Sequence, residues 1–154
     1  MNFNRYGKYL GAGALALAIA IITHFEGEVR TTYLDPVAIP TICVGHTGQD
    51  VKPHQEVTHE ACQDMLQKDI QVTWDGISAC IQTPLSDHQQ AAFISFAFNV
   101  GVRRFCSSTM AKLINKGDLV AACNELPKWI YAQGQVLPGL VNRRKAEQAL
   151  CLSH

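Results

Sequence analysis

The stretch Glu26-Gly27-Glu28-Val29-Arg30-Thr31-Thr32-Tyr33-Leu34-Asp35 begins and ends with a carboxylate and comes directly after an uncharged apolar segment. Thr41 follows six residues after Asp35, in Pro40-Thr41-Ile42. Residues 27–57 are rich in Thr, Pro and Gly, with short β-leaning pieces at 31–34 and 41–44. This composition predicts a small irregular hairpin region. Glu26 would then lie at the end of a helix and Asp35 on the adjacent hairpin.

The rest of the chain has a helical pattern. From Thr58, apolar residues recur at helical spacing for about twenty residues. The capping box Ser86-Asp87-His88-Gln89 predicts the start of an apolar helix that runs to Val100 and stops at Gly101. Shorter helices are predicted over residues 109–115 and after a cap at Asp118, and Pro138 opens a last helix to about residue 150. The predicted fold class is α+β, mainly α.

Length and composition limit the class of protein. The chain has 154 residues, 47% of them hydrophobic and 17% charged, which indicates one domain and excludes a disordered chain or a long coiled coil. The formal net charge is zero, so no nucleic-acid partner is indicated. Residues 1–90 nevertheless sum to −5 and residues 91–154 to +5. This division is typical either of a basic surface that faces an acidic polymer or of a chance distribution of solvated charges.

The N-terminus has the pattern of an export signal. Two cations, Arg5 and Lys8, precede the uncharged residues 9–25. Three interpretations remain open: a signal peptide cleaved after Ala18-Ile19-Ala20, a retained anchor at the short limit for spanning a bilayer, or a core helix that buries Ile19, Ile22 and Phe25. We expect a signal-anchor segment over residues 1–23, with a cytoplasmic tip at 1–8 and an apolar part at 9–23, followed by a catalytic domain over 24–154.

Two carboxylates at the spacing of Glu26 and Asp35 can flank a bond from two sides. Glycoside hydrolysis needs this arrangement, with one carboxyl protonated to protonate the leaving oxygen and the other ionised to position water. On spacing alone, however, such residues are more often surface charges. The surrounding motifs favour a catalytic role for the two carboxylates over a surface role.

These motifs resemble those of the phage lysozyme (endolysin) family. The family pattern E-x8-D-x5-T, with E-G, Y-x-D and T-I-x-x-G-H, is matched at every letter by the stretch from Glu26 to His46. The resemblance continues in Pro84-Leu85-Ser86, Phe98-Asn99-Val100-Gly101, Ser108-Thr109 and Leu137-Pro138-Gly139-Leu140-Val141-Asn142-Arg143-Arg144. It covers about residues 24–152 and includes the exported, signal-anchored members of the family.

The resemblance implies a lysozyme-like fold, with a small β-hairpin lobe and a helical lobe, preceded by a signal-anchor helix. It implies a muramidase that cleaves the β-1,4 bond between N-acetylmuramic acid and N-acetylglucosamine in peptidoglycan. Glu26 would be the general acid, and Asp35 and Thr41 would hold the attacking water for an inverting hydrolysis. A lytic transglycosylase and a non-catalytic peptidoglycan-binding protein on the same scaffold are the alternatives.

Two further residues are candidates for the substrate-binding site. Arg143 resembles the arginine that the family places beside the catalytic glutamate, where a fixed cation stabilises the ionised acid. The alternative is a solvated helix charge next to Arg144 and Lys145. Asn99 resembles a cleft position, with substrate contact and helix-end capping equally open.

Six cysteines without a CxxC motif argue against a zinc ribbon and favour disulfides formed in an oxidising compartment. Their number allows 15 connectivities. The resemblance implies the pairs Cys43–Cys62, Cys80–Cys106 and Cys123–Cys151. The family usually has Gly at the position of Cys43, where an unusual backbone angle is permitted. Cys43 is therefore either half of a disulfide or a thiol that acts on the two carboxyls.

No cofactor or metal is expected. His46 is interpreted as a buried hydrogen-bonding histidine, and His54, His59 and Cys62 lack an evident fourth zinc ligand. The expected partners are peptidoglycan and, through residues 9–23, the inner membrane, with the chain a monomer. We expect a single-pass protein of the host inner membrane, with its N-terminus in the cytoplasm, that is inactive while anchored and is released to the periplasm.

Overall fold

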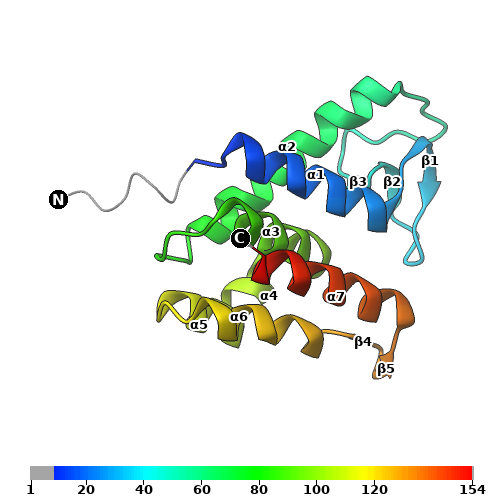
Figure 1. Ribbon diagram of the computed structural model, residues 1–154. Helices are drawn as coiled ribbons and strands as arrows, with labels where there is room; N and C mark the ends of the chain where they lie inside the picture. The colour runs from blue at the N-terminus through cyan, green and yellow to red at the C-terminus, as the bar shows by residue number, and fades with distance from the viewer. Residues whose placement is uncertain (1–8, 154) are drawn as a thin grey trace.

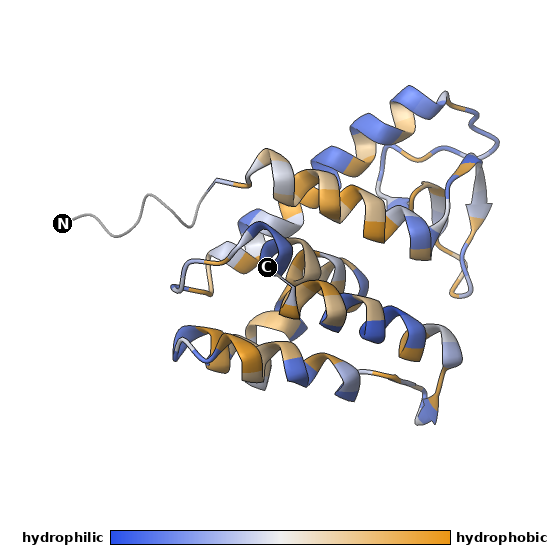
Figure 2. Cartoon of the chain, viewed as in Figure 1, coloured by the Kyte–Doolittle hydropathy of each residue, from blue (hydrophilic) through white to orange (hydrophobic). Residues whose placement is uncertain are grey.

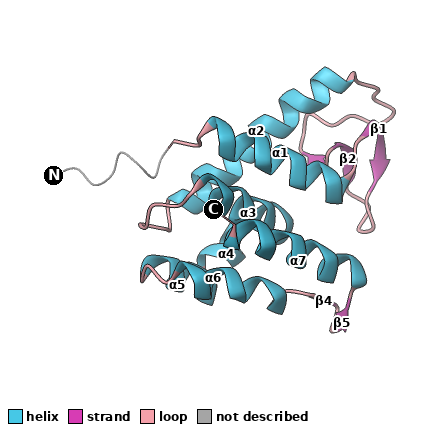
Figure 3. Cartoon of the chain, viewed as in Figure 1, coloured by secondary structure: helices cyan, strands magenta, loops and turns pink. Residues whose placement is uncertain are grey.

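The computed structural model describes residues 9–153, so the expected cytoplasmic tip at 1–8 lies outside the described residues. Figure 1 shows a layered helical body with a small sheet at one end, and Figure 3 shows the strands confined to the hairpin regions. The chain belongs to the α+β class, mainly α, as predicted. The elements are α1 (Ala12–Glu26), β1 (Val29–Leu34), β2 (Pro40–Cys43), β3 (His46–Thr47), α2 (His59–Ser78), α3 (Asp87–Val100), α4 (Val102–Cys106), α5 (Thr109–Asn115), α6 (Leu119–Glu125), the 3-10 turn η1 (Leu126–Lys128), β4 (Tyr131–Ala132), β5 (Gln135–Val136) and α7 (Pro138–Leu152).

Helix α3 is the centre of the molecule. Residues 90–97 are buried without a break, because α1, α2, α4 and α7 pack around this helix. Its sequence Ala91-Ala92-Phe93-Ile94-Ser95-Phe96-Ala97 is apolar on all sides except for one serine, which is typical of a fully enclosed helix. Figure 2 shows apolar residues on the helices that enclose it. Ser86 forms the predicted capping box with Gln89.

Helix α1 is part of the domain core. Ala14, Ala18 and Ile22, spaced four residues apart, are fully buried, and the helix packs mainly against α3. Ile22 lies on the buried face as expected, but Ile19 and Phe25 are only partly buried. The two alanines on this face lack long side chains, which permits a close approach to α3. Among residues 9–153, no helix combines the length and the apolar character that crossing a membrane requires.

The β-lobe is an antiparallel sheet in the order β1-β2-β3. Tyr33 pairs with Thr41 and Leu34 with Pro40, while the register is irregular nearer the start of β1. A second, smaller core lies under this sheet and consists of Ile42, Cys43, Val51 and Cys62. This arrangement agrees with the predicted irregular hairpin region. Helix α2 then begins at the Thr58 cap, whose hydroxyl accepts a hydrogen bond from Ala61 N at 3.1 Å.

Helix α4 and the β4–β5 hairpin were not predicted from the sequence. Gly101, at φ 97°, ends α3 as expected, but the short helix α4 begins at the next residue. The two-residue strands β4 and β5 form a hairpin between η1 and α7. The last helix runs from Pro138, as predicted, to Leu152.

The cysteines form the three pairs that the resemblance implies. Cys43 is bonded to Cys62, Cys80 to Cys106 and Cys123 to Cys151, with Cα–Cα distances of 5.0, 5.7 and 5.7 Å. Cys43 has a φ of 61° in the left-handed region, which agrees with glycine being the family's usual residue there. Because Cys43 is bonded, it offers no thiol to the nearby carboxyls in this structure.

Candidate active site

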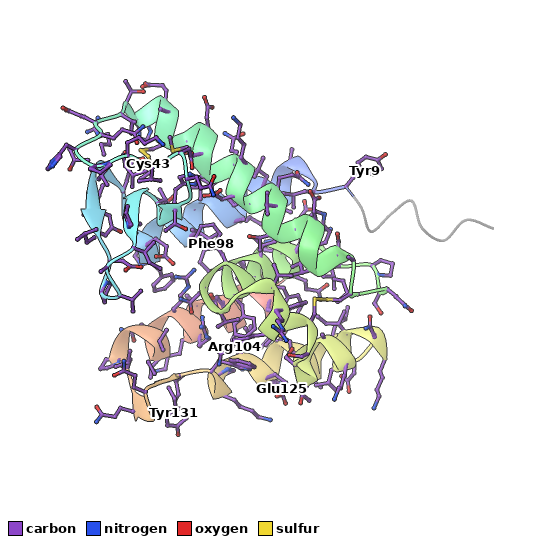
Figure 4. All side chains as sticks on the ribbon, turned by 180° about the vertical axis from the view of Figure 1, so that it is seen from behind. Tyr9, Cys43, Phe98, Arg104, Glu125 and Tyr131 are labelled. Carbon is purple, nitrogen blue, oxygen red and sulfur yellow. A yellow bond between two sulfur atoms is a disulfide. The ribbon has the colours of Figure 1, made fainter. Side chains whose placement is uncertain are left out.

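Glu26 is the last residue of α1 and faces the β-lobe. Gly27, at φ 69°, ends the helix by donating its N–H to Thr23 O at 2.9 Å, and the chain then turns into β1. A Cβ atom added to Gly45 would lie 3.5 Å from Glu26 Oε2 and 3.9 Å from the Phe98 ring. The carboxylate therefore lies at the junction of α1, the β2–β3 turn and the end of α3. Figure 4 labels Phe98 at this junction, between the β-lobe and the helical lobe.

Arg143 holds Glu26 from the helical lobe. Its Nη1 donates to Glu26 Oε1 at 2.7 Å, and the Glu26 side chain is 27% exposed. Arg143 itself is 4% exposed and Arg144 only 1%. The alternative of a solvated helix charge is therefore wrong for Arg143, and its neighbour Arg144 is buried as well. Burial of a guanidinium requires paired charges and satisfied hydrogen bonds, and α7 supplies both through Glu147, which is 0% exposed.

The buried charges form one connected network. Glu147 Oε1 accepts from Arg143 Nε at 3.1 Å and from Ser95 Oγ at 2.7 Å, and Glu147 Oε2 accepts from Arg144 Nη1 at 2.8 Å. Sequence reasoning did not single out Ser95 or Glu147. The spacing Arg143, Arg144, Glu147 was a usable signal, since residues three and four apart share one face of a helix.

Asp35 lies in the turn between β1 and β2. Its Oδ1 accepts the backbone N–H groups of Val37 and Ile39, each at 2.9 Å. Within the described chain its Oδ2 has no hydrogen-bond partner, so one carboxylate oxygen is fixed by the turn and the other is available. Thr41 is 4% exposed and its hydroxyl donates to Ile39 O at 2.9 Å. The backbone of Ile39 thus hydrogen-bonds to both Asp35 and Thr41, which fixes these two residues relative to each other.

Tyr33 connects the two carboxylates electrostatically. Burial, together with the negative charges of Glu26 and Asp35, raises the pKa of its phenol. Tyr33 lies in β1, which runs from the end of α1, where Glu26 lies, to the β1–β2 turn, where Asp35 lies.

Asn99 lies in the last turn of α3, and its Oδ1 accepts a hydrogen bond from Arg144 Nη2. The end of α3 is closed instead by the N–H of Gly101, which donates to Ala97 O at 2.8 Å. Helix-end capping by Asn99 is therefore wrong, and its candidate role in substrate contact stays a prediction. Arg144 also donates from Nε to Trp129 O at 2.9 Å.

His46 is a hydrogen-bonding histidine, as interpreted from the sequence, but it is partly buried and not fully buried as expected. Its Nδ1 lies 2.7 Å from Asp69 Oδ2 and its Nε2 lies 2.9 Å from Asp50 Oδ2. Burial of the imidazole opposes its charged form, but the hydrogen bonds to Asp69 and Asp50 outweigh this effect and raise the pKa of His46. Among residues 9–153 no group of three His, Cys, Asp or Glu side chains is arranged to hold a metal ion. His59 contacts Glu28 instead, at 2.9 Å.

A helical body with a small β-lobe, and a carboxylate held at their junction by a buried arginine, defines the chain as a lysozyme-like protein. The family described as Phage lysozyme matches residues 23–147, and the chain belongs to this family. Membership of this family supports the conclusion that the chain is an endolysin that lyses peptidoglycan.

The chain is 36% identical to a SAR-endolysin of Bacteriophage PS119, over 93% of this chain and 89% of that protein. It is 35% identical to a SAR-endolysin of Enterobacteria phage P21, over 93% and 90% of the two chains. Among solved structures, a variant of P22 lysozyme has a TM-score of 0.81 at 32% identity, covering 94% of this chain and 98% of that one. These similarities extend over nearly the whole chain, so they apply to both the α1 segment and the helical lobe.

Proposed function

We propose that the chain is an endolysin of the muramidase type, which hydrolyses the β-1,4 bond between N-acetylmuramic acid and N-acetylglucosamine. The observation that carries this proposal is the Glu26–Arg143 contact at 2.7 Å, which lies against the β-lobe that carries Asp35 and Thr41. The complete E-x8-D-x5-T motif and the membership of the phage lysozyme family support the same function.

In the proposed reaction Glu26 donates a proton to the glycosidic oxygen as the bond breaks. Asp35, through its available Oδ2, and Thr41 hold a water molecule on the opposite face of the sugar. Attack by that water, which passes a proton to Asp35 and leaves its hydroxyl on the anomeric carbon, would invert the anomeric centre. Arg143 fixes the orientation of Glu26 before and after proton transfer, and Asn99 contacts the substrate at the end of α3.

The test is digestion of purified peptidoglycan by the full chain, with mass analysis of the products. Glu26→Gln keeps the shape of the side chain but removes the acid, and we expect it to release no muropeptides. Glu28→Gln is the matched control, since Glu28 lies two residues away and contacts His59 instead. Muramic products with reducing ends support hydrolysis. Anhydro products would show a lytic transglycosylase, and binding without products from the parent chain would show a non-catalytic module.

The location proposed for the chain is the host inner membrane, through residues 9–23, with later release to the periplasm. Support comes from the SAR-endolysin relatives and from the uncharged apolar character of residues 9–25. In the structure, Ile22 is buried in the core, so the same side chain cannot also contact lipid. An anchored chain would therefore lack the core contacts of α1, and Glu26 would be displaced from Asp35.

Cell fractionation before and after membrane depolarisation tests this location. We expect full-length chain in the membrane fraction first and in the periplasmic fraction afterwards, with no change in its N-terminal sequence. A mature form that starts near residue 21 under all conditions would instead show a cleaved signal peptide. Sedimentation of the released chain tests the proposed monomer.

A further inference from the structure

Glu147 is a buried carboxylate that does not contact Glu26, Asp35 or Thr41 in the structure. It lies on α7, is 0% exposed, and receives hydrogen bonds on both oxygens. A buried carboxylate is costly unless cations and hydrogen bonds compensate it. Here the compensation comes from two consecutive arginines, and each arginine contacts a different candidate site residue.

Both arginines donate a hydrogen bond to Glu147, and their other nitrogens contact other groups. Arg143 donates from Nε to Glu147 and from Nη2 to Ser95 O at 3.1 Å, which leaves Nη1 directed at Glu26. Arg144 donates from Nη1 to Glu147 and from Nε to Trp129 O, which leaves Nη2 directed at Asn99. Each guanidinium therefore presents one nitrogen to the site, and Glu147 fixes the other side of both.

Aromatic rings also make cation–π contacts with the same guanidinium groups. Arg143 Cζ lies 5.7 Å from the centre of the Phe25 ring, and Arg144 Cζ lies 4.9 Å from that of Phe96. Such cation–π contacts add attraction in a desolvated setting. They do not fix rotation within the plane of the guanidinium, which the hydrogen bonds to Glu147 do fix.

The network contains two cations and two anions. Arg143 and Arg144 are two buried cations, and the nearby anions are Glu147, which is fully buried, and Glu26, which is partly exposed. Removal of the Glu147 charge would therefore leave both buried guanidinium groups without their shared anion.

We propose that Glu147 is a positioning residue for the reaction: through Arg143 and Arg144 it fixes the orientations of Glu26 and Asn99 together. This inference rests on the proposed function of Glu26 as the acid.

The test compares the full chain with Glu147→Gln, which keeps the size of the side chain but removes its charge. We expect kcat/KM on peptidoglycan to fall at least about 10-fold, since Arg143 and Arg144 lose their common anchor. We also expect kcat per folded molecule to fall, because Arg143 no longer holds Glu26 in one orientation. A purely structural role would lower the folded fraction and leave kcat per folded molecule unchanged.

Glu125→Gln is the matched control. Glu125 pairs with Lys128 at 2.6 Å, is partly buried, and is labelled in Figure 4 in the helical lobe, away from Phe98. Its kcat per folded molecule should match that of the parent chain.

The outcomes separate the two proposals. An inactive parent chain would overturn the proposed function. An active parent with a Glu147→Gln variant that keeps the parental rate, or loses activity only with its folded fraction, would overturn the role of Glu147. If Glu147→Gln does not fold, Glu147→Asp decides: it keeps the charge but shortens the reach, so a folded variant with a lower kcat supports positioning. An unchanged kcat in that variant would overturn it.

Discussion

Glu26 and Arg143 are separated by 117 positions in the sequence and joined by a hydrogen bond of 2.7 Å. One residue ends α1 and the other lies in the second turn of α7, so the contact exists only when both helices are packed on α3. The candidate site is thus assembled by tertiary packing.

Asp35→Asn should lower kcat/KM by about 100-fold or more while the fold is retained. The Asn amide oxygen can still accept the N–H groups of Val37 and Ile39, but the side chain loses the negative charge that polarises water. Steady-state rates and thermal unfolding measure the two effects separately. Asp64→Asn, an exposed position on α2, serves as the control. Equal rates for Asp35→Asn and the parent would exclude Asp35 from the reaction.

Removal of the Cys43–Cys62 disulfide should reduce the free energy of unfolding by about 2–4 kcal/mol. Two double variants share this loss: Cys43→Gly with Cys62→Ala, and Cys43→Ala with Cys62→Ala. The glycine version should be more stable by about 1 kcal/mol, because residue 43 has a φ of 61° that alanine adopts with strain. Denaturant unfolding of both proteins compares them. A more stable alanine version would show that residue 43 leaves the left-handed region once the disulfide is absent.

The His46 contacts should make stability depend on pH. Since the folded-state pKa of His46 is raised, its contribution is complete below the ordinary histidine value of about 6.5 and is lost as the pH rises through the folded-state pKa. The parent chain should therefore lose more of its Tm between pH 5 and pH 8 than His46→Gln does. Asp69→Asn should reduce this dependence as well, because it removes the partner at 2.7 Å. Parallel Tm curves for parent and His46→Gln would contradict the prediction.

Ala18→Leu should destabilise the folded domain by about 1–3 kcal/mol, because it adds atoms to a closed contact between α1 and α3. Ala20→Leu introduces the same side chain at an exposed position two residues further along the helix. Its effect should stay within about 0.5 kcal/mol. Unfolding of the two purified variants by denaturant, with disulfides intact, gives the comparison. Equal losses would mean that α1 does not pack on the domain through this face.

The elements with strong local signals could be predicted from the sequence. The Ser86 capping box and the Pro138 start define α3 and α7 by local chemistry. Helix α4 and the β4–β5 hairpin were missed, because five residues and two plus two residues are too few for a periodic pattern.

The candidate site shows the same division between local and distant information. Glu26, Asp35 and Thr41 belong to one short motif, so the sequence places them near one another. The burial of Arg143 and Arg144 depends on Ser95 and Trp129, which are distant in sequence and have no motif of their own. The structure was needed to distinguish a solvated arginine from a buried one.

The three disulfides enclose residues 43–62, 80–106 and 123–151, so α1 lies outside every covalent loop. An oxidised chain keeps these loops closed whether or not α1 is seated on α3. Helix α1 can therefore be separated from the cross-linked remainder of the domain without reducing a disulfide bond. A synthetic helix with the α1 sequence, ending in Glu26, is thus a rational partner for fragment complementation, in which activity would report the docking of one element.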